Sequence, residues 1–61
     1  MLNLEMPIEL IVSIINTYLR SKYSSLEALC DVEDLDIEEL TKKLENNNYE
    51  YDLSSNQIKR K

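Results

Sequence analysis

Apolar residues recur with a helical period in the first third of the chain, between Pro7 and Lys22. Proline suits the first turn of a helix, because the N–H that it lacks has no intrahelical partner there. We therefore predict a first helix over residues 7–22. Its apolar side chains cover an arc of about 200°, roughly twice the stripe of an ordinary surface helix. Such a helix lies either at the centre of the fold or in a subunit interface, and the second hypothesis gives a candidate dimer face of Ile8, Ile11, Ile15 and Leu19.

A second helix is predicted from Ser24 and Glu27, which have the spacing of a capping box. In this motif the serine hydroxyl accepts from an amide one turn further on, and the glutamate reaches back to the serine amide. The helix then covers residues 25–31. Its inner face consists of Leu26, Leu29 and Cys30. Because the chain has no histidine to activate a thiol, we interpret Cys30 as a small buried apolar residue.

A third helix is predicted over residues 37–46, with Asp36 as its N-cap and Glu39 completing a second capping pair. Three consecutive asparagines, Asn46–Asn48, end it. The chain contains no glycine, and asparagine is the next residue most tolerant of the left-handed backbone that closes a helix. We therefore expect one of these asparagines to adopt it. The predicted inner face is Ile37, Leu40, Thr41 and Leu44.

The C-terminal part changes to a period of two at Tyr49-Glu50-Tyr51, a pattern that favours a strand. We predict a short β-hairpin over residues 49–59, followed by a basic tail over residues 60–61. A short helix capped by Asp52 or Ser54 is the alternative.

Leu2, Leu4 and Met6 alternate with Asn3 and Glu5 near the N-terminus, so residues 1–6 are expected to form either a short extended segment or a frayed end. The whole pattern predicts one mainly α domain over residues 1–61. Its architecture is a compact three-helix, helix-turn-helix-like fold with a short C-terminal β-hairpin.

The composition excludes several kinds of chemistry. The net charge is −5, and the chain has one cysteine and no histidine, so it forms no internal disulfide and no zinc site. The acidic run over residues 31–39 fails the EF-hand spacing, because Asp36 stands where that loop needs glycine. No nucleophile–base pair or glycine-rich phosphate loop is present. We expect no metal, no cofactor and no catalytic site.

A lone cysteine and the lack of a signal peptide indicate the reducing cytoplasm. The longest apolar stretch is shorter than the ~20 residues that span a bilayer, so we expect a soluble protein without a membrane partner. With 61 residues the chain is near the lower limit for folding unaided, which favours either efficient helix packing or self-association.

A helix-turn-helix arrangement raises the alternative of a small nucleic-acid-binding regulator. A recognition helix meets the phosphates with its N-terminal residues, but here that end carries Asp34, Asp36, Glu38 and Glu39. These charges oppose docking to DNA. The available cations are Lys42, Lys43 and the terminal Lys59-Arg60-Lys61. Nucleic acid is therefore the less favoured partner.

Two polar clusters remain as candidate interaction residues or structural staples. The first is Asn16 with Arg20 on helix 1, and the second is Tyr49, Tyr51, Asn56 and Gln57 around the hairpin. As staples, Arg20 would bond Asp52 or a carbonyl near Tyr51, and Asn16 would bond the chain returning from the hairpin.

Three stretches resemble a family of very small bacterial proteins classed as a domain of unknown function. They are Asn16-Thr17-Tyr18-Leu19-Arg20, Ser25-Leu26-Glu27-Ala28-Leu29-Cys30, and Tyr49-Glu50-Tyr51-Asp52 followed by Asn56-Gln57. The chain departs from this pattern at Ser21, where the family has aspartate, and at Ile58, where it has an aromatic residue. The resemblance spans nearly the whole chain and implies no activity.

The functional hypothesis is therefore a small, cytoplasmic, non-enzymatic protein. Its partner is expected to be a protein, either a second copy bound through helix 1 or another cytoplasmic protein.

Overall fold

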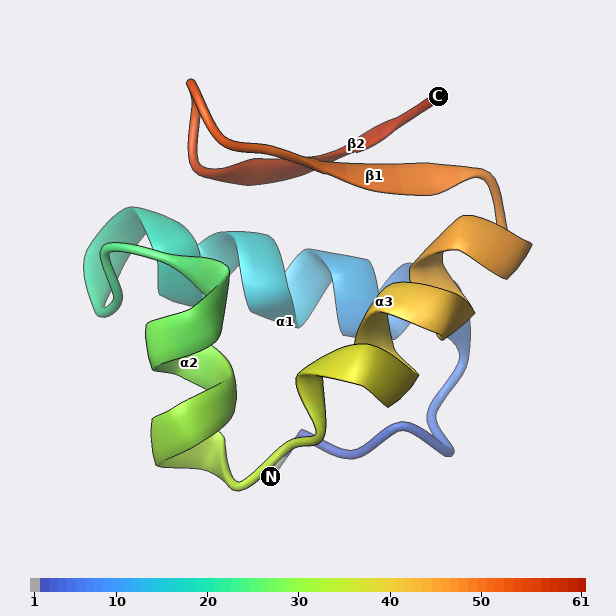
Figure 1. The fold of residues 1–61 in the computed structure, drawn as a ribbon, viewed down its shortest axis with the longest axis horizontal. Helices are drawn as coiled ribbons and strands as arrows, with labels where there is room; N and C mark the ends of the chain where they lie inside the picture. Colours follow the sequence, from blue (N-terminus) through green and yellow to red (C-terminus); the bar gives the residue numbers. More distant parts are fainter. Residues whose placement is uncertain (1) are drawn as a thin grey trace.

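The computed structural model describes residues 2–61 and confirms the predicted fold class. Helices α1 (Ile8–Ser21), α2 (Leu26–Glu33) and α3 (Ile37–Asn46) are followed by the antiparallel strands β1 (Tyr49–Asp52) and β2 (Gln57–Arg60). The hairpin covers α1 and α3, while α2 packs near the C-terminal end of α1 (Figure 1). The three-residue turn between α2 and α3 gives the helix-turn-helix-like order.

Helix α1 lies at the centre of the fold, which explains its wide apolar arc. Ile11 and Ile15 are fully buried and Leu19 is 5% exposed, while Ile8 is half-buried against the core. Three residues of the candidate dimer face thus belong to the intramolecular core, which corrects their assignment to an interface. The cover comes from α2, β2 and the N-terminal segment. The core comprises Leu2, Ile11, Ile15, Leu19, Leu26, Leu29, Cys30, Leu40, Leu44 and Ile58.

The start of α2 differs from the predicted capping box. Ser25, not Ser24, is the N-cap, and its hydroxyl accepts from the Ala28 N–H at 3.1 Å. The helix also continues two residues past Asp31, because Asp34 takes the left-handed conformation (φ 59°) that ends it. The inner face of Leu26, Leu29 and Cys30 is buried as predicted.

Helix α3 has the predicted bounds. The Asp36 carboxylate accepts from the N–H groups of Glu38 (2.9 Å) and Glu39 (3.4 Å), which satisfies two of the amides that lack helical partners. Asn48 is the asparagine with left-handed backbone (φ 65°). Thr41 is exposed, so its assignment to the inner face was wrong.

The hairpin pairs Tyr49 with Arg60, Glu50 with Lys59, Tyr51 with Ile58, and Asp52 with Gln57. The predicted basic tail is part of this pairing, because Arg60 ends β2 and the Lys61 N–H donates to the Asn48 carbonyl at 2.8 Å. Arg60 and Lys61 are exposed, but they continue the hairpin instead of forming a separate tail.

The N-terminal segment is not the extended strand that its alternation suggested. The Asn3 side chain accepts from the Glu5 N–H at 2.9 Å, and the backbone turns at Leu4 and Glu5. The turn carries Leu2 into the core, where it is 3% exposed. Met1, the first residue of the predicted segment, lies outside the described residues.

Candidate binding site

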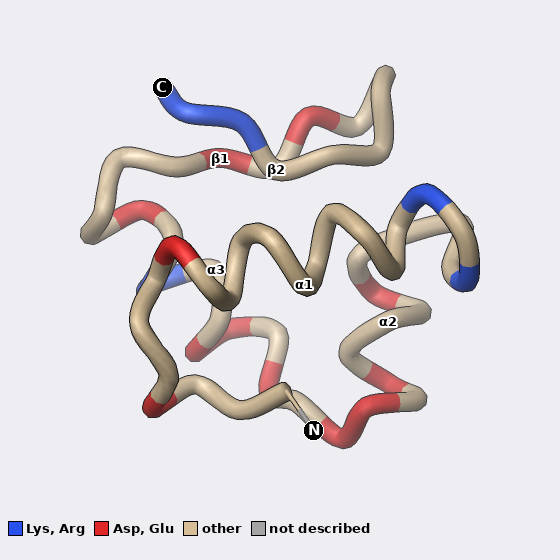
Figure 2. Tube along the Cα trace, turned by 180° about the vertical axis from the view of Figure 1, so that it is seen from behind, with Lys and Arg blue, Asp and Glu red and all other residues tan. Residues whose placement is uncertain are grey.

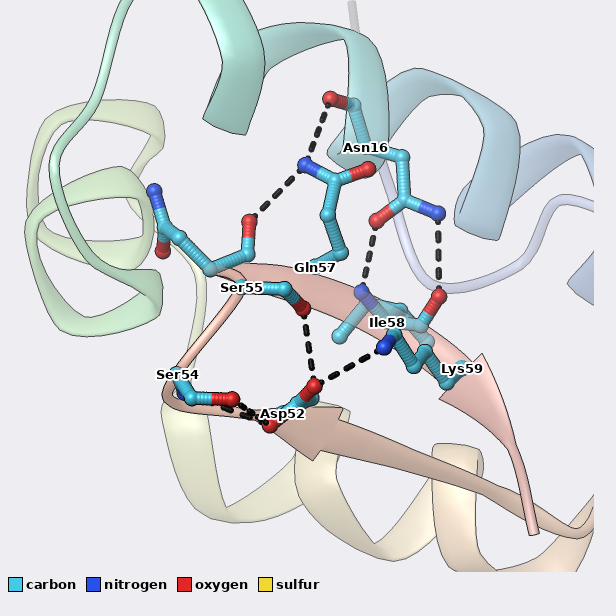
Figure 3. A network of polar contacts seen from close by, with 8 residues as sticks. Asn16, Asp52, Ser54, Ser55, Gln57, Ile58 and Lys59 are labelled. Atoms are coloured by element: carbon cyan, nitrogen blue, oxygen red, sulfur yellow. Dashed lines mark hydrogen bonds and ion pairs between the residues drawn. The ribbon is translucent and has the colours of Figure 1, made fainter.

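Asn16 joins the central helix to the hairpin as the sequence predicted. Its Nδ2 donates to the Ile58 carbonyl at 3.0 Å, and its Oδ1 accepts from the Ile58 N–H at 2.7 Å (Figure 3). One side-chain amide thus makes the two bonds that a residue of a neighbouring strand would make. These bonds take up the backbone groups of Ile58 on the side of β2 that faces away from β1.

A second polar junction ties the hairpin loop to the end of α1. The Asn56 Nδ2 donates to the carbonyls of Leu19 (3.1 Å) and Tyr23 (3.2 Å), and the Asn56 Oδ1 accepts from the Tyr51 hydroxyl. The Gln57 Nε2 donates to the Asn16 carbonyl at 3.4 Å and to the Asn56 carbonyl at 2.8 Å. Asn56 therefore satisfies the Leu19 carbonyl, which the helix end leaves without a partner, and the Tyr23 carbonyl just beyond the helix.

Asp52 organises the hairpin loop. Its carboxylate accepts from the hydroxyls of Ser54 and Ser55, both at 2.9 Å, and pairs with the Lys59 Nζ at 3.0 Å (Figure 3). The ammonium group of Lys59 and the two hydroxyls hold the pKa of Asp52 well below its usual range. Lys59 therefore serves Asp52, although the strand register places it opposite Glu50.

Arg20 does not take part in this network. Its side chain is exposed, and it makes no side-chain hydrogen bond or ion pair within residues 2–61. The predicted bond to Asp52 or to the chain near Tyr51 is therefore wrong, because Lys59 occupies that carboxylate. Of the other hairpin candidates, Tyr49 accepts a hydrogen bond from Arg60 at 3.2 Å, and the guanidinium lies 5.3 Å from its ring centroid.

Asn16, Asn56 and Gln57 thus make their hydrogen bonds within the molecule. This favours a structural role for these three residues, in which they hold the hairpin on α1. Tyr49 and Tyr51 are different, because both also border a groove.

This groove lies between the start of α2, helix α3 and strand β1, and has a volume of about 520 Å³. Its floor is apolar and its rim carries several charges. Leu53 lies at one edge of the groove and is 79% exposed. The lining residues are Ser25, Leu26, Glu27, Ile37, Thr41, Leu44, Glu45, Tyr49, Glu50, Tyr51, Leu53 and Lys61.

Strand β1 borders the groove with an unpaired edge. Since the Ile58 backbone bonds outward to Asn16, its pair with Tyr51 is a non-hydrogen-bonded pair of the ladder. By the alternation of the ladder, the N–H and C=O groups of Tyr49 and Tyr51 both point away from β2. No backbone group within residues 2–61 bonds to them. A peptide edge with four open hydrogen-bonding groups therefore follows the groove.

The groove rim is mainly acidic. The charged residues that border it are Glu27, Glu45, Glu50 and Lys61, with Glu50 on the outer face of β1. None of the three glutamates forms an ion pair in the described part of the chain. Figure 2 shows the basic segments at separate places, at the end of β2, at the C-terminal end of α1 and on α3. Acidic residues occupy the start of α3. Residues 2–61 thus present no continuous basic face of the kind that binds nucleic acid.

Cys30 has the buried position that the sequence predicted. It is 3% exposed, and burial, together with the nearby Asp36 charge, raises the pKa of its thiol. Both effects lower the thiolate fraction that a nucleophile requires. Within residues 2–61 no group of acidic or cysteine side chains has the arrangement of a metal site. No helix in the same range is long and apolar enough to cross a bilayer.

A family model described as a domain of unknown function (DUF4250) matches residues 5–58. The chain belongs to this family. The match includes the three helices, β1 and the first half of β2, which confirms the family resemblance noted in the sequence. No match was found among curated proteins or among solved structures.

Most of the residues that line the groove of this DUF4250 member are not predictable from the sequence, because they come from three separate segments of the chain. The sequence predicts Tyr49 and Tyr51 as candidates, whereas it places Thr41 on the inner face of a helix and gives no role to Leu53. One signal was present in the sequence. Leu53 is an apolar residue in an otherwise polar turn, between Asp52 and Ser54, and in the structure it adds to the apolar surface of the groove.

Proposed function

We propose that this domain is a protein-binding module and that its binding site is the groove between α2, α3 and β1. The observation that supports the proposal most directly is the combination of an apolar groove with the open edge of β1. The partner that fits is a protein segment with apolar side chains for the floor and basic side chains for the rim. Glu27 and Glu45 at the rim, together with Glu50 on the outer face of β1, provide the complementary charge.

Binding rather than catalysis is favoured by the side chains that border the groove. Its titratable groups are glutamates, tyrosines and one lysine, with no histidine or cysteine among them. Histidine is the side chain that most often acts as a general acid or base, and cysteine is a common nucleophile. A cytoplasmic location is consistent with the reduced, buried Cys30.

Site-specific photo-cross-linking tests this proposal. A photoreactive amino acid replaces Thr41 in the groove or, as a control, Ser13 on the exposed side of α1, and both side chains are exposed. We expect a protein cross-linked from position 41 and not from position 13. The protein so identified is then purified, and its affinity for the domain is measured.

Charge reversal completes the test. Glu45→Lys alters the groove rim, whereas Asp31→Lys makes the same charge change on α2 outside the groove. We expect Glu45→Lys to weaken the complex and Asp31→Lys to leave it unchanged. Equal affinities of the two variants, or equal cross-linking from both positions, would reject the groove as the binding site.

A further inference from the structure

The open edge of β1 narrows the class of partner that fits the groove. We infer that the partner binds as an extended strand that adds to β1, with the pattern apolar–basic–apolar where it passes Tyr49, Glu50 and Tyr51. This inference rests on the proposed function and specifies how the groove is filled.

The backbone geometry carries the first step. Tyr49 and Tyr51 each present an N–H and a C=O on the side of β1 that β2 does not use. Extended peptides add to such edges through main-chain hydrogen bonds, and pockets for alternate side chains supply the specificity. A helix or a globular surface would leave these four groups to water.

The direction of the side chains gives the second step. Tyr51 shares a face of the hairpin with Ile58, which is buried in the core, so the odd-numbered positions of β1 face the helices. An added strand continues this alternation. Its residues beside Tyr49 and Tyr51 therefore point into the groove, toward Leu26, Ile37 and Leu44, and are expected to be apolar.

The residue beside Glu50 points to the opposite, solvated face. Glu50 is exposed, and Lys59, its neighbour across the hairpin, pairs with Asp52 instead. A lysine or arginine in the added strand finds an unpaired carboxylate directly across from it. Opposite charges at such positions stabilise pairing and like charges oppose it.

The same charges argue against a second copy of this chain as the added strand. Antiparallel self-pairing of β1 about Glu50 places two Glu50 side chains opposite each other. Self-pairing about Tyr51 places Glu50 opposite Asp52. Both registers oppose like charges, and pairing about Tyr49 would require Asn48, whose left-handed backbone (φ 65°) lies outside the strand. The strand that fits therefore comes from a different protein.

Nuclear magnetic resonance of the full chain tests the inference with a capped peptide, Ile-Lys-Ile flanked by threonines. At millimolar peptide we expect slower hydrogen exchange at the Tyr49 and Tyr51 amides. Two further peptides carry N-methyl groups on one or the other alternate set of amides. A strand donates only the set that faces its neighbour, so one of these peptides binds and the other does not.

The charge requirement is tested by titration. Glu50→Gln is expected to weaken binding of the lysine peptide about two- to fivefold. Glu9→Gln makes the same charge change at an exposed position of α1, away from β1, and is expected to leave the affinity unchanged. A peptide with glutamate in place of the lysine binds the unmodified domain more weakly.

Three results would overturn the strand inference. The first is that the Tyr49 and Tyr51 amides exchange as fast with millimolar peptide as without it. The second is that the two N-methylated peptides bind equally well. The third is that, without any peptide, hydrogen exchange at these amides slows as the protein concentration rises, which would show that a second copy of the chain occupies the edge. If the cross-linked partner still loses affinity for Glu45→Lys, the proposed function stands while the strand inference fails. If that partner binds Glu45→Lys and Asp31→Lys equally, the proposed function fails independently of any result with peptides.

Discussion

Replacing Asn16 tests how the hairpin is held on the helices. Asn16→Ala removes both bonds to the Ile58 backbone, at 3.0 and 2.7 Å, in a partly buried site. Each such bond contributes about 1 kcal/mol. Alanine returns about 0.6 kcal/mol through its higher helix propensity. The expected net loss in the free energy of unfolding is about 1.5 kcal/mol, or about 6–12 °C in melting temperature for a domain of this size.

Asn16→Asp tests the two hydrogen bonds separately, because it keeps the acceptor for the Ile58 N–H and changes the donor to the Ile58 carbonyl. An ionised aspartate still accepts from the Ile58 N–H but faces the Ile58 carbonyl with a second acceptor. Protonation supplies an O–H that donates to that carbonyl, so folding raises the pKa of the new carboxyl group. A raised folded pKa adds stability at low pH that is lost as the pH rises. Relative to the unmodified domain, Asn16→Asp should therefore be less destabilised at pH 4 than at pH 7.

Urea and thermal unfolding followed by circular dichroism measure both effects. Ser13→Ala is the control, because Ser13 is exposed on the same helix and its side chain makes no hydrogen bond within residues 2–61. The dependence on urea should keep the same slope, which shows that the unfolded state is unchanged. The reasoning fails if Asn16→Ala unfolds within ~0.3 kcal/mol of the unmodified domain, or if Asn16→Asp is equally destabilised at the two pH values.

Further predictions concern four side chains. The depressed pKa of Asp52 means that its contribution is complete above the unfolded pKa of about 3.9 and is lost as the pH falls through the lower folded pKa. Asp52→Asn should therefore flatten the acid side of a melting-temperature profile, and an unchanged acid limb would contradict this. Asp34→Gly should stabilise the domain by about 0.5–1 kcal/mol in urea titrations, since Asp34 has left-handed backbone at the end of α2; a loss of stability would refute the conformational argument. Arg20→Ala should change stability by less than ~0.5 kcal/mol, because the described chain gives Arg20 no polar partner. Cys30 should react with a thiol reagent only at the rate of structural opening, and rapid labelling of the folded domain would contradict its burial.

The local features of the fold were predictable because short-range chemistry determines them. Helix α3 has the predicted bounds since Asp36 caps its start and the asparagines close its end. The start of α2 was misplaced by one residue because either Ser24 or Ser25 is a suitable cap. The structure uses Ser25, immediately before the buried Leu26.

The long-range features were harder to predict. Nothing in the alternation at the N-terminus shows that the chain turns at Leu4 and carries Leu2 into the core. Leu2 therefore helps to bury the apolar face of α1, which a second subunit was expected to cover. The bond from Asn16 to the returning strand was inferred, whereas Arg20 was paired with the wrong position because Lys59 competes for Asp52. The groove required three segments to be placed in space, which a pattern along one segment does not supply.

The bonds from Asn16 to Ile58 also bear on how a sheet of two strands could grow. A two-stranded sheet has two edges, and if both were open, copies or partners could join on either side and extend into an open-ended chain. Here the side chain of Asn16 closes the centre of one edge from within the molecule. If a strand adds to β1 as we propose, the sheet has little room to grow on the β2 side, because Asn16 already bonds the Ile58 backbone there. We therefore expect one added strand per domain rather than an open-ended assembly.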